Sequence, residues 1–254
     1  MTRSTPSHLW FDVTAETIGD TALWTNKVEI ADINGDGLPD LLFANGGNYS
    51  EPGTPEPNLV FINHGPAKPF ENRTEAVFGP TPDIARVIKA RDLNNDGIVD
   101  IIVGTTYQTQ SRLYLGTGSG AFKEVTSTHL PHLLASIGDL EIGDVDGDGD
   151  LDIVLADWGP GNNMTNAGGR ARLWLNDGTG HFTDATESQM PATLSRFSWD
   201  LEFVDVDNDA DLDIVVSCKR CGGGSLFKND GTGKFTEDGR GLPQYTNNYE
   251  YEAM

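Results

Sequence analysis

The chain has few basic residues and no long apolar run, and each shortage excludes a class of protein. Only 17 lysines and arginines stand against 39 acidic residues in 254 residues, which gives a net charge of −22. A chain this negative repels polyanions, so nucleic acid and anionic membrane surfaces are excluded as partners. No apolar stretch is long enough to span a membrane. The opening MTRSTPSHLWF lacks the apolar segment of a signal peptide, so we expect that a signal was removed or that the sequence is an excised piece.

Sequence signatures of catalysis are missing as well. The chain contains no H-E-x-x-H, no G-x-S-x-G and no phosphate-binding glycine loop. Its five histidines are scattered and no pattern selects one of them as a base. We therefore expect no catalysis by this chain. The alternative is a fragment or accessory domain of a carbohydrate-active enzyme, a polysaccharide lyase or hydrolase.

One acidic nonapeptide is abundant and occurs four times. The copies are DINGDGLPD at 32–40, DLNNDGIVD at 92–100, DVDGDGDLD at 144–152 and DVDNDADLD at 205–213. Each copy places carboxylate or amide oxygens at positions 1, 3, 5 and 9, with a turn at position 6. Hard oxygen donors on a short loop are typical of Ca²⁺ sites, and the absence of His and Cys argues against zinc and copper. The sequence therefore predicts four calcium sites.

The predicted ligands are the side chains at positions 1, 3, 5 and 9 and the backbone carbonyl at position 7. They are Asp32, Asn34, Asp36, Leu38 and Asp40; Asp92, Asn94, Asp96, Ile98 and Asp100; Asp144, Asp146, Asp148, Asp150 and Asp152; and Asp205, Asp207, Asp209, Asp211 and Asp213. Glycine at position 6 permits the positive φ of a sharp turn. The fourth loop has Ala210 there, so we expect roughly 1 kcal/mol of strain and a weaker site.

The residues after each loop distinguish it from an EF-hand. An EF-hand needs a bidentate Glu at position 12 and flanking helices. Position 12 is instead Phe43, Val103, Leu155 or Val216, each inside an apolar run of strand length such as DLLFA or DIVLA. A single such loop could be a solvated turn, but four copies in phase favour metal binding.

The loops belong to a longer repeat. They begin 60, 52 and 61 residues apart, and a second motif, an aromatic residue followed four positions later by Thr or Gly, recurs in step as WFDVT, FENRT, FKEVT, FTDAT and FTEDG. Glycine-rich hairpin signals such as LNDGTGHF precede this motif. Each repeat therefore holds four strands, which predicts the blade of a β-propeller.

These motifs resemble the FG-GAP/VCBS-type calcium-binding β-propellers, the repeat family of integrin α-subunit heads and of many secreted bacterial proteins. The resemblance implies an all-β fold of four-stranded antiparallel blades, with a calcium loop between the first and second strands of each blade. We place complete blades at about 23–74, 84–126, 137–186 and 198–239, and partial strands at 8–14 and 249–254. Similar families close with seven blades, so we expect 1–254 to be one domain or part of a longer propeller. The alternative is a five-bladed ring closed by the terminal strands.

The resemblance leaves the ligand open, because the family includes adhesins, lectins and accessory domains. We expect a glycan or protein ligand on the face opposite the calcium loops, where long loops and connections between blades gather. Candidate contacts on that face are Tyr49, Tyr107, Trp158 and Trp199. Tyr49 and Trp158 are expected to be exposed, whereas packing between blades is the alternative for Trp199. Open blade edges also predict self-association.

The cysteines and the calcium loops both indicate the compartment. The only two cysteines, Cys218 and Cys221, predict a local disulfide, with two free thiols as the alternative. The four loops hold 16 of the 39 acidic residues, so four bound Ca²⁺ would reduce the net charge to −14. Sites with a Kd near 10⁻⁴ M are occupied at millimolar calcium, about 1.5 kcal/mol of stabilisation each. We therefore expect an extracellular or periplasmic protein.

Overall fold

Antiparallel sheet makes up most of the described chain. The computed structural model describes residues 11–48, 51–66, 68–161, 165–218, 224–239 and 242. Four four-stranded sheets, here called blades one to four, follow one another along the chain. Their strands are β1 (Thr25–Ala31), β2 (Asp40–Asn45), β3 (Leu59–Ile62) and β4 (Glu71–Asn72); β5 (Ala85–Arg91), β6 (Asp100–Thr105), β8 (Arg112–Gly118) and β9 (Ala121–Glu124); β11 (Ile137–Gly143), β12 (Asp152–Asp157), β13 (Ala171–Asn176) and β14 (Phe182–Asp184); β15 (Ser198–Val204), β16 (Asp213–Cys218), β17 (Ser225–Asn229) and β18 (Phe235–Glu237). A two-stranded sheet pairs β7 (Thr109–Gln110) with β10 (Leu134–Ala135).

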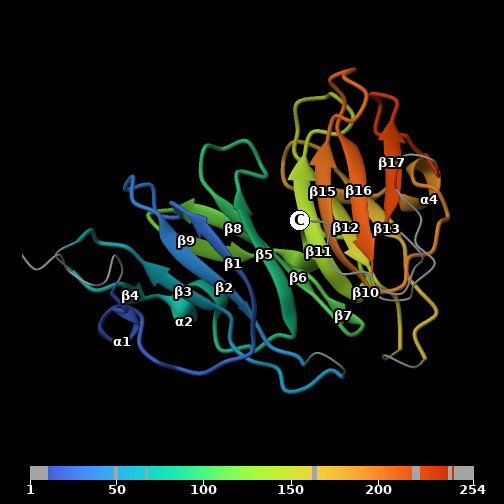
Figure 1. The fold of residues 1–254 in the computed structure, drawn as a ribbon. Coiled ribbons are helices and arrows are strands. Elements are labelled where there is room, and N and C mark those ends of the chain that lie inside the picture. Colours follow the sequence, from blue (N-terminus) through green and yellow to red (C-terminus); the bar gives the residue numbers. More distant parts are fainter. Residues whose placement is uncertain are drawn as a thin grey trace, which may run out of the picture.

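The blades form an open arc. Within each blade the strands run up and down in chain order, and the first strand of each blade contacts that of the next, β1 with β5, β5 with β11 and β11 with β15. Figure 1 shows the blades in sequence from the first (blue) on one side to the fourth (orange and red) on the other. The predicted all-β, propeller-like architecture is confirmed, and among the residues described here the sheets do not close into a ring.

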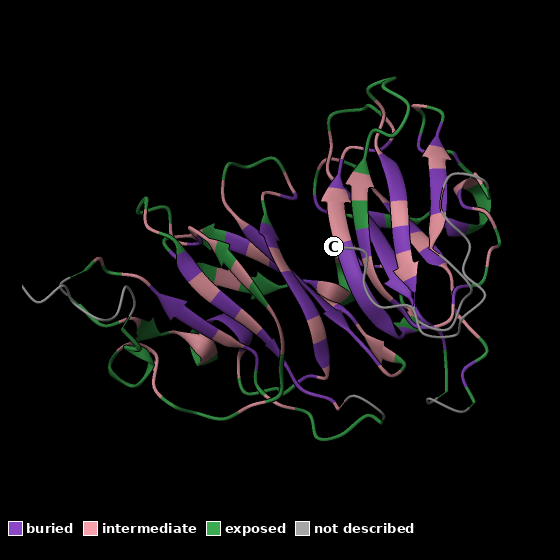
Figure 2. Ribbon diagram, in the orientation of Figure 1, coloured by how far each residue is buried: buried purple, intermediate pink, exposed green. Residues whose placement is uncertain are grey.

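Most of the core lies between consecutive blades. Apolar side chains of the middle strands of one blade pack against the first strand of the next, in three separate clusters. Figure 2 shows the result, since the strands in the middle of the arc are mainly purple whereas β1 carries green and pink positions. Strands buried on both faces explain why the runs after each acidic loop are continuously apolar.

Four short helices were not predicted. They are α1 (Thr14–Thr17), α2 (Thr74–Phe78), α3 (Thr126–His129) and α4 (Thr186–Gln189), and each begins at the Thr of an aromatic–Thr motif. Three of these threonines also accept a backbone N–H from the third strand of their blade, from Val60, Leu113 and Leu173 at 3.0–3.1 Å. The Thr of the motif therefore joins the outer edge of a blade to the connection that follows.

The expected partial strands are not seen as predicted. In the described part of 8–14, residues 11–13 are irregular and Thr14 begins α1, so the prediction of a strand there is wrong. The reason is local, because the Asp12 carboxylate accepts the Thr14 N–H at 3.0 Å and turns the chain into the helix. Residues 249–254 lie outside the described residues.

Candidate metal loops and ligand pocket

The acidic loops all lie at one end of the blades, each between the first and second strands. In every loop the backbone N–H of position 6 donates to the first-position aspartate, at 2.7 Å from Gly37, 2.8 Å from Gly97, 3.0 Å from Gly149 and 3.1 Å from Ala210. The position-5 carboxylate accepts the N–H of position 7 in the same way. The side chains predicted to bind a cation are thus already turned inward by the loop backbone.

The ninth-position aspartates have a second, structural role. Asp40, Asp100, Asp152 and Asp213 are all fully buried. One oxygen of each accepts the N–H of position 2 of its own loop, at 2.8–3.1 Å. The other accepts an N–H from the third strand of the blade or, in blade one, from Asn63 directly after that strand, at 2.7–2.9 Å. Each of these aspartates therefore joins its loop to its sheet, which the sequence pattern did not indicate.

Burial disfavours the charged form of these carboxylates. It raises the pKa of Asp100 to about 6 and that of Asp152 to about 7, against the backbone N–H bonds that lower both values. A cation bound in the loop would favour the ionised form. The buried carboxylates therefore suit a loop that holds a positive ion.

The spacing of the carboxylates also fits calcium. Oxygens of Asp144, Asp146 and Asp152 lie within 4.8 Å of one another, as do oxygens of Asp205, Asp207 and Asp209. Two ligands of the same Ca²⁺, each about 2.3–2.6 Å from it, are at most about 5 Å apart. The first and second loops have Asn34 and Asn94 at position 3, whose amides donate to the position-5 carboxylates at 3.0 and 3.1 Å. All four donor sets consist of oxygen ligands of the kind that Ca²⁺ prefers.

The four loops differ in how many residues have a strained backbone. Position 6 has a positive φ in each, including +75° at Ala210, as predicted. Position 4 is also left-handed, at Gly35, Asn95, Gly147 and Asn208, which the sequence analysis missed although Gly and Asn are the residues that tolerate this conformation. The fourth loop has two non-glycine residues at positive φ, and the third loop has none.

A small pocket lies where the first strands of the four blades converge, here called the axis, at the end of the blades opposite the acidic loops. Each first strand has a β-bulge at its second residue, which is Asn26, Arg86, Gly138 or Trp199. These four residues, together with Lys27 and Asp200, line a pocket of about 280 Å³. The Arg86 guanidinium lies 4.2 Å from the centre of the Trp199 ring and donates to Asn26 Oδ1 at 2.9 Å. Repetition of one bulge in four blades thus brings four different residues together, three of them with side chains.

An aromatic cluster supports this pocket. Trp158 stacks on Phe197 and Trp199, at centroid distances of 5.5 and 6.3 Å, and meets Tyr107 edge-on at 5.2 Å. The structure therefore brings together Tyr107, Trp158 and Trp199, three of the residues proposed from the sequence as ligand contacts, and their contact with a ligand stays a prediction. The expectation that Trp158 is exposed is wrong, because its side chain is 3% exposed and its indole N–H donates to Thr106 Oγ1 at 3.0 Å. Tyr49 lies outside the described residues.

The backbone around the aromatic cluster is strained. Tyr107, Gln108 and Phe197 have φ values of +54°, +61° and +50°. A left-handed conformation costs an L-residue roughly 1–2 kcal/mol, and such strain gathers at ligand sites where packing enforces it. Of the seven non-glycine residues at positive φ in the described chain, these three belong to the aromatic cluster or follow it directly in the chain, and three others lie in the acidic loops.

Charged side chains near the pocket link blades one, three and four. The Lys27 ammonium lies 2.7 Å from Asp139 Oδ1 and 3.5 Å from Asp200 Oδ1. Asp139 is fully buried, and burial, with a hydrogen bond to Asp200, raises its pKa to about 7 although Lys27 acts in the opposite direction. These three residues could not be identified from the sequence, because nothing in the motifs shows that three first strands converge.

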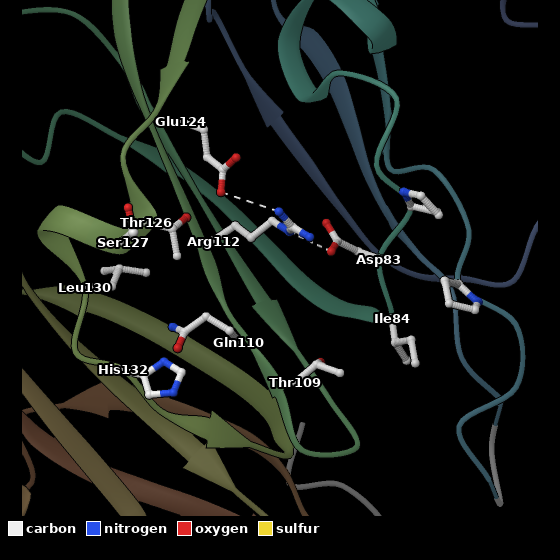
Figure 3. Close-up of a pocket in the computed structure, with 12 residues that line it drawn as sticks. Asp83, Ile84, Thr109, Gln110, Arg112, Glu124, Thr126, Ser127, Leu130 and His132 are labelled. Atoms are coloured by element: carbon white, nitrogen blue, oxygen red, sulfur yellow. Dashed lines mark hydrogen bonds and ion pairs between the residues drawn. The ribbon is translucent and has the colours of Figure 1, made fainter.

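A wider cleft lies between the connections of blades one, two and three. It has a volume of about 660 Å³ and is lined among others by Asp83, Gln110, Arg112, Glu124 and His132. In Figure 3 Arg112 lies between the two carboxylates, with Nε 2.7 Å from Asp83 and Nη1 3.4 Å from Glu124. The arginine is thus held by acidic partners, and no motif in the sequence indicates this cleft.

Only one of the two cysteines lies among the described residues. Cys218 ends β16, is buried and is disulfide-bonded, whereas Cys221 lies outside the described residues. The pairing of these two residues stays a prediction.

Three segments of the chain match the family described as the FG-GAP-like repeat, at residues 32–103, 92–155 and 163–216. They cover more than half of the chain and contain all four acidic loops. The protein belongs to the FG-GAP-like repeat family. No curated protein sequence matches the chain, and no helix of the described residues is long and apolar enough to cross a membrane.

Solved structures resemble the chain at low sequence identity. An Agrocybe aegerita lectin that recognises non-reducing terminal N-acetylglucosamine is 20% identical, with a TM-score of 0.48 over 82% of this chain and 49% of the lectin chain. The V. cholerae biofilm matrix protein Bap1 is 16% identical, with a TM-score of 0.45 over 85% of this chain and 39% of Bap1. BBS1N, in complex with ARL6DN, is 12% identical, with a TM-score of 0.47 over 89% of this chain and 58% of BBS1N. The chain spans less than two thirds of each of these proteins.

Proposed function

We propose that this protein is a calcium-stabilised binding module that takes a glycan or protein ligand at the end of the blades opposite the acidic loops. The observation that carries the proposal is the axial pocket, where Arg86 lies over Trp199 and Trp199 stacks on the buried Trp158 and Phe197. A rigid polar and aromatic concavity of this kind is typical of binding sites. We place the protein outside the cell or in the periplasm, where millimolar calcium keeps such loops occupied.

The proposed calcium ions have a structural role. Asp32, Asp92, Asp144 and Asp205, with the other side chains of their loops, would hold one ion each at the end remote from the pocket. A bound ion offsets the repulsion among the loop carboxylates and fixes the turn into the second strand. Calcium thus acts on the ligand site only through the stability of the blades.

The size and chemistry of the pocket limit the ligand. A volume of about 280 Å³ lies just below the usual range for small-molecule sites, so it suits one sugar unit or one protruding side chain. Trp199 is covered by Arg86 on its ring face and contacts Trp158 and Phe197. Recognition therefore depends on hydrogen bonds from Arg86 and Lys27 at the rim more than on stacking against an open indole face.

A screen on a glycan array tests this proposal, once in 2 mM calcium and once with chelator (our chosen conditions). The expected result is binding that requires calcium and is lost in Arg86→Ala and Trp199→Ala. Arg112→Ala is the matched control, because it removes the same type of side chain from the wider cleft. Circular dichroism melts confirm that each variant is folded.

The outcomes separate the candidate ligands and sites. A blank array with folded protein favours a protein ligand, and pull-downs with wild type and Arg86→Ala then replace the array. Loss of binding in Arg112→Ala, but not in Arg86→Ala, would place the ligand in the wider cleft and contradict the axial site. A ligand that is consumed with formation of product would contradict our proposal that the chain has no catalysis of its own and favour the carbohydrate-active enzyme.

A further inference from the structure

Two asparagines of the chain are followed directly by glycine, Asn34 in the first acidic loop and Asn45 at the end of β2. Asparagine is chemically labile. In deamidation, the backbone nitrogen of the next residue attacks the carbon of the asparagine side-chain amide. A following glycine favours this reaction, because it has no Cβ to hinder the approach and adopts many backbone conformations. The two sites share this sequence but differ in their surroundings.

The hydrogen bonds around Asn34 are arranged like those of a small catalytic site. The Gly35 N–H, which carries the attacking nitrogen, donates to Asp32 Oδ1 at 2.8 Å. The Asp36 N–H donates to Asn34 Oδ1, the oxygen of the amide under attack, at 2.9 Å. A carboxylate that accepts the proton of a nucleophile acts as a general base, and a donor to a carbonyl oxygen stabilises the charge that develops there. Both contacts therefore lower the barrier to attack.

The first loop also provides the water and the backbone freedom that the reaction needs. Gly35 is exposed and has a φ of +77°, and no heavy atom lies within 4 Å of a Cβ added to it. Position 4 is exposed in the second and third loops as well, at Asn95 and Gly147. Those loops belong to blades that have a neighbour on each side, so the exposure of Gly35 is a property of the loop and does not depend on the place of blade one in the arc.

The surroundings of Asn45 oppose the same reaction. Asn45 is fully buried, its Oδ1 accepts the Thr25 hydroxyl at 2.7 Å and its Nδ2 donates to the Pro57 carbonyl at 2.8 Å. The Gly46 N–H donates to the Trp24 carbonyl at 2.9 Å, and a carbonyl is a far weaker base than a carboxylate. The fold therefore protects Asn45 and leaves Asn34 reactive.

We infer that Asn34 is a modification site, at which the chain converts the third-position amide of its first acidic loop to a carboxylate. The Gly35 nitrogen passes its proton to Asp32 and bonds to Asn34 Cγ. The Cγ–Nδ2 bond breaks, and the amide nitrogen leaves as ammonia with that proton. Water then adds to the five-membered succinimide ring and opens it to aspartate or isoaspartate. The sum is an amide and water giving an acid and ammonia, with no change of oxidation state.

The modification changes the first loop alone. Aspartate at position 34 gives this loop the same side chains at positions 1, 3, 5 and 9 as the third loop, where Asp146 stands at position 3. It also replaces the amide that donates to Asp36 at 3.0 Å by a like charge, so the loop gains more from a bound cation. Isoaspartate instead adds a methylene to the backbone and displaces the turn. This effect on the metal site rests on the calcium binding proposed above, whereas the reaction itself does not.

Peptide mass spectrometry of the full chain, stored in chelator at neutral pH, tests the inference. The storage temperature is one at which circular dichroism shows the chelated chain to be folded. We expect conversion at Asn34 to be about tenfold or more faster than at Asn45 and Asn94. Asn94 is the matched site, because its amide makes the same two contacts to Asp96 but Asn95 replaces the glycine. Equal conversion at Asn34 and Asn45, or none at Asn34, overturns the inference.

Two variants test the roles of the neighbouring residues. Gly35→Asn reproduces the second loop, where Asn95 adopts a φ of +58°, and should slow conversion at Asn34 about tenfold or more. Asp32→Asn keeps an oxygen acceptor for the Gly35 N–H but removes the base, and should slow conversion about tenfold. Asp12→Asn is the matched control, because it changes a carboxylate that accepts a backbone N–H outside the loops, and should leave the rate unchanged. A wild-type rate in Asp32→Asn would overturn the inference that the loop promotes its own conversion.

The same storage in calcium separates this inference from the proposed function. Asp32 and Asn34 Oδ1, on which the reaction depends, are also predicted calcium ligands, so conversion should be several-fold slower with calcium. If the chain binds no calcium, the rates with calcium and with chelator agree and the proposed function fails, while conversion at Asn34 in chelator still stands. Calcium that raises the melting temperature without slowing conversion would contradict the predicted ligands of the first loop.

Discussion

The third and fourth acidic loops have the same five carboxylates but differ in what supports them. DVDGDGDLD and DVDNDADLD differ only at positions 4 and 6, where Gly147 and Gly149 are replaced by Asn208 and Ala210. All four residues have a positive φ, which glycine adopts freely and the other two do not. Val145 of the third loop is buried under blade four, whereas Val206 of the fourth loop is exposed. We therefore expect the two loops to differ in calcium affinity although their carboxylates are the same, because the backbone and the following blade support them differently.

Removal of calcium should have the largest effect on stability, and the fourth loop should be affected before the third. At about 1.5 kcal/mol per site, four sites contribute roughly 6 kcal/mol, a large part of a domain's net stability. We expect chelator to lower the melting temperature strongly, with the fourth loop losing its ion before the third as calcium falls. Calorimetric melts over a calcium series measure this. Restoration by calcium but not by magnesium is the control, and a melt that ignores chelator would refute the structural role of the ions.

Truncation of the ninth-position aspartate should have the next largest effect on stability, and the loss should differ between the third and fourth loops. Asp152→Ala leaves two buried backbone N–H groups without an acceptor, those of Val145 and Asn176, at a cost of about 2–5 kcal/mol. Asp213→Ala should cost less, about 1–3 kcal/mol, because the N–H of the exposed Val206 can turn to water. Urea unfolding in chelator measures both without the contribution of calcium. Equal losses would show that the exposed position of the fourth loop has no energetic consequence.

The stability of the whole chain should depend on pH through Asp139, a buried residue of β11 at the axis, so the two loops have to be compared at one pH. Burial raises its pKa to about 7, above the unfolded value, so the folded chain retains a proton that the unfolded chain has lost between about pH 4 and 7. Stability therefore falls as pH rises through this window, by at most about 1.4 kcal/mol per unit. Asp139→Asn should flatten this slope in unfolding experiments at saturating calcium, while Lys27 and Asp200 remain. An unchanged slope would contradict the raised pKa.

Exchange of the position-6 residues should give the smallest and most specific effect. Ala210→Gly removes the left-handed alanine and should stabilise the fourth loop by about 1 kcal/mol, or raise its calcium affinity about fivefold. Gly149→Ala should weaken the third loop by a similar amount, since no heavy atom lies within 4 Å of the added Cβ and only the backbone conformation is strained. Calorimetric calcium titrations measure both changes. If neither affinity changes, strain does not explain the difference between the loops.

Much of the fold follows from the repeat, whereas most of the ligand site does not. The loops, the apolar runs and the aromatic–Thr motif predicted the four strands of each blade, because each motif fixes a local turn or pairing. The strain at Ala210 was predicted for the same reason. The burial of Trp158 was not, because its glycine-rich surroundings suggest exposure, whereas its burial depends on Tyr107 and Phe197 from other blades. Contacts that join distant repeats, such as Lys27 with Asp139, leave no local pattern in the sequence.

The bulge in every first strand separates what the repeat must keep from what it can vary. Because the second residue is left out of the strand pairing, Asn26, Arg86 and Trp199 can differ without a change in register, whereas Gly138 is required where the Ser198 carbonyl would lie 2.1 Å from an added Cβ. Substitution at these three positions, one in each of three blades, can therefore change the side chains that line the axial pocket without a change in strand register. For a protein engineer, these three positions could be varied to change what the pocket binds, at the end of the blades opposite the acidic loops.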